Sequence, residues 1–421
     1  MRDSPQTPHP DQEVPVPDLT IAAPGYAATS AGDVLDLVRR DTARTRAEIG
    51  RRTGLSRTAV SARVDALLDA GLLTRGHRAG TGGRPAETLA LAGDAGRVVS
   101  LAVGRSRSQV GVVDLTGRLL DADSLDHPDG APPSPATLLA ALAHRARGLL
   151  GDDSPAAVAV GLSLPASVDA TGSRVQESLV LPAWDHLDPS LHLAELGGLP
   201  IVVGNDADVL ASAELQARPD LRDALVVKAS TGIAVGIVSD GRVLHGHRGA
   251  AGELGHVRTP SAEGRLCRCG STGCLETVAA GWALVEEARL GAGERPAPAH
   301  VRDLVAAARE GDASARELLA ASSRHVGEAL ATAVTLLNPE VVVLAGDMGS
   351  LYDVYAAGVR EAIWPRLASP AARDLRLEPS GVDGSPDGIG GLVGAASMTL
   401  DRLMSPPSVD AWLSEGRPRI V

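Results

Sequence analysis

Apolar positions near the N-terminus recur at helical spacing. Between residues 56 and 69 they fall at i, i+4, i+7 and i+8, so one face of a helix carries Val60, Val64, Leu67 and Leu68. Residues 33–40 have the same kind of apolar stripe. The capping-box sequence Thr45-Arg46-Ala47-Glu48 predicts the start of another helix between these two, and Gly54 predicts its end.

Two short apolar segments follow the third helix. Gly71 ends that helix, and residues 72–74 and 88–91 are typical of strands on either side of the glycine-rich loop 79–85. Three helices and a hairpin in this order predict a winged helix-turn-helix, which we assign to residues 29–92. Residues 1–28 have no periodicity and are rich in Pro, Asp and Gln, which predicts a disordered N-terminal tail.

From residue 96 the pattern changes to strands that alternate with helices. Two pairs of neighbouring strands, at residues 98–103 with 109–114 and at 224–227 with 233–238, each open a longer run of buried elements. Further strands are predicted at residues 156–164, 200–203 and 341–344, the last after a helix over residues 315–337. This repeated α/β plan predicts two lobes around a cleft, at about residues 96–220 and 221–400, followed by a C-terminal tail over residues 401–421.

Charge divides the 421 residues into a basic module and an acidic body. Residues 31–90 hold 11 Arg, no Lys and 7 acidic residues, a net charge of +4, so the rest of a chain of net charge −12 carries −16. This distribution is typical of a DNA reader whose remaining surface avoids DNA. No apolar run reaches the ~18 residues of a membrane span, and the N-terminus has no apolar signal segment, so we expect a cytoplasmic protein with no membrane partner.

The most specific chemical signal is a set of metal-ligand residues. All three cysteines of the chain lie in one eight-residue segment, and together with the preceding histidine they are His256, Cys267, Cys269 and Cys274. Three thiolates and one imidazole are typical of a closed, structural Zn²⁺ site. The alternative is three reduced thiols and an unrelated histidine, but such dense spacing is uncommon without a metal.

The same segment resembles the ROK family of repressors and sugar kinases. The matching stretches are Ala251-Gly252-Glu253-Leu254-Gly255-His256 and the run from Cys267 to Thr277, with further matches at residues 161–165, 181–184 and 203–208. The resemblance covers about residues 30–400 and is strongest to the transcriptional-regulator branch that contains the N-acetylglucosamine and xylose repressors. It implies an actin-like, ribonuclease-H-like two-lobed sugar-kinase fold behind the winged helix.

The resemblance also implies a sugar site. The family's equivalent of His256 binds zinc through one ring nitrogen and a sugar hydroxyl through the other. The sugar-binding residues implied in this chain are Asn205, Asp206, Glu253, His256 and Glu276. Taken singly, an Asn-Asp pair is usually a turn, and each glutamate is usually a solvated surface charge. Their combination with the metal motif favours a shared site.

The phosphate-handling part of the kinase pattern is altered. Asp206, the general base of the family's kinases, is retained. Ala102 stands where those kinases carry the aspartate that positions the metal and phosphates, and a methyl group cannot hold Mg²⁺. The second phosphate loop, residues 230–236, also departs from the pattern. We therefore expect a sugar sensor with no catalytic residues. One alternative is an ATP-dependent ROK sugar kinase with an appended DNA-binding domain. The other is a scaffold that has lost both sugar binding and DNA binding.

The third helix predicts the DNA contacts. Its first turns carry, away from the apolar face, Arg57, Thr58, Ser61 and Arg63, and the wing carries Arg84. A protein-interaction winged helix is the alternative. The resulting hypothesis is a repressor, or an activator, that binds double-stranded operator DNA as a homodimer or tetramer and responds to a sugar or sugar derivative.

Overall fold

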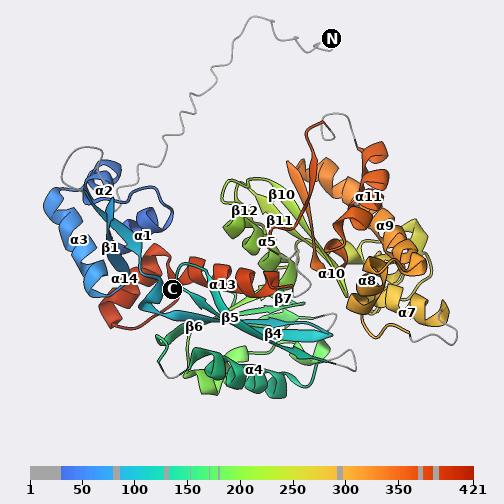
Figure 1. Ribbon diagram of the computed structural model, residues 1–421, viewed down its shortest axis with the longest axis horizontal. Coiled ribbons are helices and arrows are strands. Elements are labelled where there is room, and N and C mark those ends of the chain that lie inside the picture. Colours follow the sequence, from blue (N-terminus) through green and yellow to red (C-terminus); the bar gives the residue numbers. More distant parts are fainter. Residues whose placement is uncertain are drawn as a thin grey trace, which may run out of the picture.

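The computed structural model describes residues 30–78, 86–127, 132–151, 153–169, 171–178, 181–291, 297–367, 373–382 and 388–421. The chain forms a winged helix at one end and two α/β lobes, with helix α5 between the lobes (Figure 1). The predicted N-terminal tail and the wing loop, including Arg84, lie outside the described residues. No helix in the described part of the chain is long and apolar enough to cross a membrane.

The winged helix has the predicted order of three helices and a hairpin. Its elements are α1 (Ala31–Arg39), α2 (Arg46–Thr53), α3 (Arg57–Asp69), β1 (Leu73–Arg78) and β2 (Ala86–Leu91). Thr45 caps α2 by accepting a hydrogen bond from the amide of Glu48, and the Glu48 carboxylate accepts one from the amide of Arg44 rather than from that of Thr45. Ser56 caps α3 in the same way through the amide of Ala59.

The first lobe is built on a five-stranded sheet of order β5-β4-β3-β6-β9. Its strands are β3 (Arg97–Val103), β4 (Arg107–Asp114), β5 (Leu119–Asp126), β6 (Ala157–Leu164) and β9 (Ile201–Asn205). Alternate residues of β3 point to opposite faces. Val99 packs with α4 (Pro135–Leu150), whereas Val98 packs with α13 (Gly390–Leu403), so helices cover both faces.

The second lobe repeats this plan with the sheet order β12-β11-β10-β13-β14. Its strands are β10 (Ala224–Ala229), β11 (Ile233–Ser239), β12 (Arg242–Val243), β13 (Val341–Ala345) and β14 (Arg376–Pro379). In both sheets three antiparallel strands are followed by two parallel ones. The predicted pair of lobes that each open with a strand hairpin is confirmed.

Helices cover both faces of the second sheet as well. One face packs against α6 (Glu276–Ala279), α7 (Gly281–Gly291), α8 (Val301–Arg309), α9 (Ala313–Leu337), α10 (Gly346–Gly349) and α11 (Tyr352–Ile363). The other face packs against α5 (Asp206–Ala217). Helix α5 also crosses α13 closely, because a Cβ on Gly394 would lie 1.9 Å from the carbonyl oxygen of Val209. Only glycine allows this approach.

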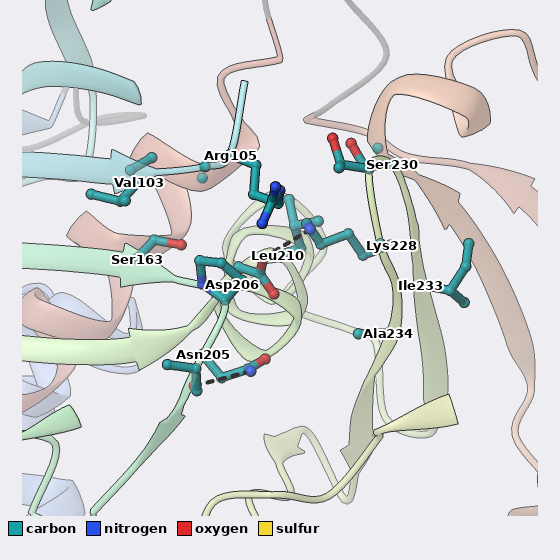
Figure 2. A pocket seen from close by; sticks show the side chains of 18 of the residues that line it. Val103, Arg105, Ser163, Asn205, Asp206, Leu210, Lys228, Ser230, Ile233 and Ala234 are labelled. Atoms are coloured by element: carbon teal, nitrogen blue, oxygen red, sulfur yellow. Dashed lines mark hydrogen bonds and ion pairs between the residues drawn. The ribbon is translucent and has the colours of Figure 1, made fainter. Parts of the chain in front are cut away.

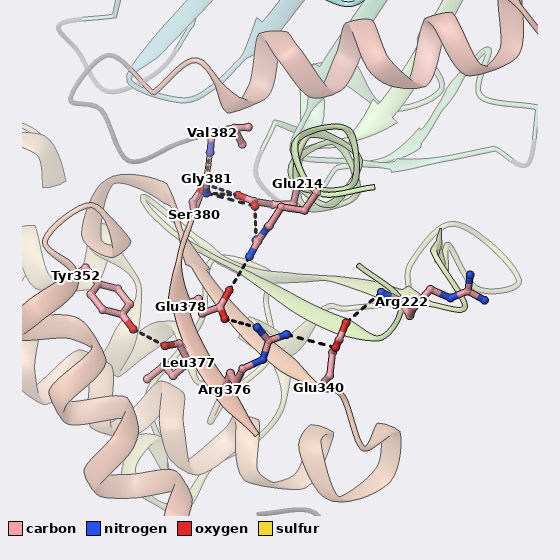
Figure 3. A network of polar contacts seen from close by, with 11 residues as sticks. Glu214, Arg222, Glu340, Tyr352, Arg376, Leu377, Glu378, Ser380, Gly381 and Val382 are labelled. Carbon is pink, nitrogen blue, oxygen red and sulfur yellow. Dashed lines mark hydrogen bonds and ion pairs between the residues drawn. The ribbon is translucent and has the colours of Figure 1, made fainter. Parts of the chain in front are cut away.

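A buried polar network fixes α5 to the edge of the second sheet (Figure 3). Glu214 of α5 is fully buried and accepts hydrogen bonds from the Ser380 hydroxyl and the Gly381 amide. Arg218, the residue that caps the C-terminus of α5, forms ion pairs with Glu214 and with Glu378 of β14. These partners compensate the charge of the buried Glu214 carboxylate. The network therefore holds α5 at the β14 edge of the second sheet.

The C-terminal part corrects two of our boundaries. Residues 390–400, which we placed in the second lobe, belong to α13 on the first sheet, because the apolar side chains of this helix pack on β3 and β6. Residues 401–421, which we left as a tail, contain the end of α13 and a further helix, α14 (Pro406–Glu415). Val409 and Trp412 of α14 are buried against the winged helix, which explains why this segment is ordered.

Candidate ligand site and metal centre

The four predicted metal ligands come together in a loop of the second lobe. One ligand atom from each of His256, Cys267, Cys269 and Cys274 lies within 4.8 Å of the others. Cys269 Sγ is 3.7 Å from Cys274 Sγ, and two thiolates at about 2.3 Å from one zinc ion would lie about 3.8 Å apart. Gly270 and Gly273 both have φ of +84°, a left-handed conformation that lets the loop turn back on itself.

The protonation chemistry of the cluster also fits a cation. Burial raises the pKa of the Cys267 thiol to about 12 and raises that of Cys274. Thiolates at these positions therefore need a positive charge beside them. A Zn²⁺ ion held by the three cysteines and His256 would supply it, as a structural centre without an open coordination position.

His256 lies between the metal cluster and a cavity. Its Nδ1 is 3.9 Å from Cys267 Sγ, and its Nε2 is 3.7 Å from a carboxylate oxygen of Glu253. The two ring nitrogens thus face two different sites. A metal bound at Nδ1 would fix the ring plane and leave Nε2 directed at the cavity.

The cavity lies in the cleft between the lobes and has a volume of about 330 Å³. That volume is in the range of small-molecule sites. All five predicted sugar-binding residues line it, which the chain brings together from β9, α5, the loop before the metal cluster and α6: Asn205, Asp206, Glu253, His256 and Glu276.

Asn205 ends β9 and caps α5. Its side-chain oxygen accepts a hydrogen bond from the amide of Ala207 at 2.9 Å, and its amide group donates to the carbonyl of Ala166 at 3.2 Å. These bonds fix the Asn205 side chain at the N-terminus of α5. Asp206, the next residue, therefore starts α5 with its carboxylate directed into the cleft (Figure 2).

Lys228 is a charged residue of the cavity that the sequence analysis missed. Its ammonium group lies 2.8 Å from the carboxylate of Asp206, which joins β10 of the second lobe to α5 (Figure 2). Burial alone would lower the pKa of Lys228, but the carboxylate of Asp206, with Asp347 and Glu276 beyond it, raises it overall. Lys228 therefore stays charged. The sequence feature that could have identified Lys228 is the presence of a lysine within an otherwise apolar strand, Ala224-Leu225-Val226-Val227-Lys228-Ala229.

The two glutamates differ in their surroundings. Glu276 is buried, and its two carboxylate oxygens accept hydrogen bonds from the amide of Ile233 at 2.8 Å and from the indole of Trp282 at 3.2 Å. Glu253 is more exposed, and burial together with the charges of Asp206 and Glu276 raises its pKa, against the opposing effect of His256. Glu253 is thus the better placed of the two to exchange hydrogen bonds with a ligand.

The described DNA-contact candidates gather at one end of α3. Arg57 and Thr58 are exposed on its first turn, whereas Ser61 and Arg63 are half-buried. The guanidinium of Arg63 donates to the carbonyl of Ala59 within the helix, at 3.0 Å. Val60, Val64 and Leu67 face the core on the opposite side. This leaves Arg57 and Thr58 as the pair most available to a partner.

Two family models match the chain. The model of the ROK family matches residues 98–402. The chain belongs to the ROK family. The model of the MarR family matches residues 29–85, which contain the three helices and the first strand of the winged helix that precedes the ROK domain. The expected family and the mixed α/β fold behind an N-terminal winged helix are confirmed.

Relatives of the ROK domain include regulators and kinases. The chain is 26% identical over 339 residues to the Escherichia coli K12 DNA-binding transcriptional dual regulator NagC, with 76% of this chain and 80% of NagC covered. A glucokinase of Halalkalibacterium halodurans is 28% identical over 262 residues, with 58% of this chain and 78% of the glucokinase covered.

Solved structures give the same picture. A ROK family transcriptional regulator, a homologue of the E. coli MLC protein, superposes with a TM-score of 0.71 and 25% identity, covering 88% of this chain and 95% of its own. A Streptomyces griseus ROK glucokinase in complex with glucose and AMPPNP has a TM-score of 0.62 and 26% identity, and covers 72% of this chain and 99% of its own. The two regulators thus match a larger share of the chain than the two glucokinases do.

The ROK domain and the winged helix share one hydrophobic core. Leu400 and Leu403 at the end of α13 pack together with apolar residues of α1, α3 and the first sheet. The other end of α13 reaches the ligand cavity, where Gly391 lies against Ala102. One helix of the ROK domain therefore spans from the cavity to the winged helix.

Proposed function

We propose that this protein is a sugar-responsive transcriptional regulator of carbohydrate metabolism, most simply a repressor. It binds double-stranded operator DNA through the winged helix, as a homodimer or tetramer. A small sugar or sugar derivative binds in the cleft between the lobes and alters DNA binding. The ROK domain acts as a sensor rather than as a kinase.

The observation that carries this proposal is the position of α13. Its first turns lie at the cavity and its last turns lie in the core shared with the winged helix. A movement of the first lobe relative to the second would therefore carry the DNA-binding domain with it, because the winged helix shares its core with the first lobe. A kinase would have no use for such a connection.

The proposed absence of catalysis rests on two residues. Ala102 supplies no ligand for a metal–nucleotide complex at the first hairpin of the cavity. The Lys228 ammonium neutralises Asp206, the residue that would have to accept a proton from a sugar hydroxyl. The Asp206 carboxylate would have to leave this ion pair before it could take up that proton.

A sugar kinase with an appended DNA-binding domain is the second candidate. The retained Asp206 and the glucokinase relatives favour it. A coupled assay with purified protein, ATP and a panel of hexoses, N-acetylhexosamines and pentoses distinguishes the two. We expect no sugar-dependent ADP formation above background. Clear turnover would favour the sugar-kinase function instead.

In this proposal the cavity residues hold the hydroxyl groups of the sugar. Asn205 and Asp206 bind one edge of the ring, and Glu253, His256 and Glu276 bind the other, with Glu276 also fixing Ile233 and Trp282. A Zn²⁺ ion held by His256, Cys267, Cys269 and Cys274 would be structural: it would order the loop and orient His256.

The DNA-binding part is tested on an operator selected from random DNA by repeated binding and amplification. We expect Arg57→Ala to weaken operator binding by roughly 1–3 kcal/mol if Arg57 contacts a guanine. Arg84→Ala should weaken binding with less sequence preference. Arg147→Ala, at an exposed position of α4, is the matched control and should bind normally. Normal binding by both the Arg57 and the Arg84 variant would refute the recognition-helix assignment.

A further inference from the structure

A side pocket adjoins the cavity that holds the proposed sugar contacts. It is lined by the hairpin of β7 (Ser167–Val168) and β8 (Val175–Glu177) in the first lobe and by the segment after β12 in the second lobe. Its volume of about 530 Å³ is in the range of small-molecule sites. Ser167, Glu177 and Ala250 line both the cavity and the side pocket, and none of the three is buried. The boundary between the two spaces is therefore open to solvent, and a ligand in the cavity can extend across it.

The two lobes meet closely beside the side pocket. Gly249, in the segment after β12, has a φ of +66°, and a Cβ on it would lie 2.3 Å from the carbonyl oxygen of Val168 in β7. A side chain at this position is therefore excluded. The residues on either side of it, Arg248 and Ala250, line the side pocket from the second lobe. A ligand in the side pocket would thus contact both lobes.

Four polar side chains of the side pocket form no hydrogen bond or ion pair with another described residue. Three come from the first lobe and one from the second: Gln176, Glu177, His186 and Arg248. A carboxylate only accepts hydrogen bonds and a guanidinium only donates them, whereas a side-chain amide and an imidazole do both. Free donors and acceptors therefore face the same space. This combination suits hydroxyl groups, because each hydroxyl can donate one hydrogen bond and accept others.

The charges of the side pocket favour a neutral ligand. Glu177 and Arg248 supply one free charge of each sign. The other two charged residues already have partners, since Asp169 accepts hydrogen bonds within its own loop and Arg174 forms an ion pair of 3.4 Å with Asp188. An ionic ligand of either sign would meet one free group of its own charge, which is unfavourable. A neutral, hydroxylated ligand can bind to both.

We infer that the effector contains at least two sugar units, with one ring in the cavity and the next in the side pocket. The inference rests on the proposed function and specifies its ligand class as a neutral disaccharide or longer oligosaccharide. The hydroxyls of the second ring would bind Gln176, Glu177 and His186 from the first lobe and Arg248 from the second. Since these contacts join the two lobes, the second ring would favour closure more than a single sugar does.

The test compares each monosaccharide with its disaccharides by calorimetry on the full-length protein. Glucose is titrated beside maltose and cellobiose, N-acetylglucosamine beside N,N′-diacetylchitobiose, and xylose beside xylobiose. We expect one disaccharide to bind at least about tenfold more tightly than its monosaccharide, because the second ring adds several hydrogen bonds.

Two substitutions assign the preference to the side pocket. Gln176→Ala in the first lobe and Arg248→Ala in the second change residues that line the side pocket but not the cavity. Each should remove most of the preference for the disaccharide and leave the affinity for the monosaccharide unchanged. Arg242→Ala, at an exposed arginine of β12 that lines neither space, is the matched control and should bind both ligands like the wild type. Equal midpoints of thermal unfolding would exclude loss of the fold.

The two levels of the proposal fail differently. A monosaccharide that binds at least as tightly as every disaccharide built from it would overturn the second subsite and leave the sugar-responsive function intact. A disaccharide preference that survives in both the Gln176 and the Arg248 variant would do the same. If no monosaccharide or disaccharide bound, both the subsite and the proposed function would be overturned.

Discussion

The winged helix and the second lobe both contact the first lobe, but their junctions differ in polarity. The winged helix meets it through an apolar core in which Leu400, Leu403 and Trp412 are buried. The second lobe packs on α5 through apolar residues as well, but it also meets the first lobe around a cavity lined by charged groups, with Lys228 and Asp206 paired across the cleft. An apolar core resists partial separation, whereas a polar cleft can exchange its internal partners for those of a ligand. We therefore expect the junction between the winged helix and the first lobe to be rigid, and the junction between the two lobes to move.

The largest expected effect is a break in the apolar junction. Leu403→Ala removes a fully buried side chain from the core shared with the winged helix, which should cost roughly 2–5 kcal/mol of unfolding free energy. Denaturant unfolding measures the loss, and hydrogen exchange should show it in the winged helix and the first lobe together. Leu336→Ala, at a position 78% exposed on α9, is the control. Loss confined to the first lobe would contradict a shared core.

The next effect concerns the ion pair of the cleft. A double-mutant cycle with Lys228→Met and Asp206→Asn should give a coupling of roughly 1–3 kcal/mol, because both groups are largely buried. The matched cycle is Arg39→Met with Asp401→Asn, an ion pair at the apolar junction in which Asp401 is 63% exposed. That pair should couple by less than about 1 kcal/mol. Equal couplings would remove the contrast between the two junctions.

The metal centre gives a third test, on the second-lobe side of the cleft. Cys269→Ser should lose zinc and weaken sugar binding by about tenfold, because His256 loses its orientation, while the winged helix still binds DNA. Glu253→Gln should lose the sugar response and keep one zinc per chain. Metal analysis paired with sugar titration measures both. Normal sugar binding by a zinc-free Cys269→Ser variant would show that the metal stabilises its loop without influencing sugar binding through His256.

The smallest expected effect is a pH dependence where the segment after β12 meets α5. His245 Nδ1 lies 2.6 Å from the buried carboxylate of Asp208 on α5, and this hydrogen bond raises the pKa of His245 despite burial and the charge of Arg402. Burial likewise raises the pKa of Asp208. Since both folded-state pKa values are raised, the native state binds more protons, and stability falls as pH rises.

The His245 contribution should be complete below its unfolded pKa of about 6.5 and be lost as pH rises through the higher folded value. Its size should stay below about 1 kcal/mol, because the His245 side chain is half exposed. Unfolding of His245→Gln across this pH range should lack the decline. A decline that survives in the variant would assign the effect to another group.

Much of the fold and of the candidate metal site could be predicted from the sequence, because these features depend on local patterns. The stripe of Val60, Val64 and Leu67, the caps at Thr45 and Ser56, and the strand hairpins are encoded in neighbouring residues. The metal ligands were recognisable for the same reason, since Cys267, Cys269 and Cys274 lie within eight residues.

Features that depend on distant partners were not predictable. α14 has its apolar residues at ordinary spacing, but its burial comes from contact with α1, more than 360 residues earlier, where Gly32 donates to Asp410. Lys228 stood out in its strand, yet its partner Asp206 could not be assigned before the two lobes were placed. β5 was missed because polar residues interrupt its apolar ones, as an edge strand permits; its sequence is Leu119-Leu120-Asp121-Ala122-Asp123-Ser124-Leu125-Asp126.

The central claim is that the winged helix moves with the first lobe as one body while the second lobe closes. Distances between three exposed labels test it: Ala66 on α3, Ala140 on α4 and Leu336 on α9, each replaced by a non-natural amino acid so that the metal-binding cysteines stay unlabelled. On addition of the sugar identified by calorimetry, single-molecule energy transfer should show a change between positions 140 and 336 and no change between positions 66 and 140. A change between positions 66 and 140, with the distance between the lobes constant, would contradict the account.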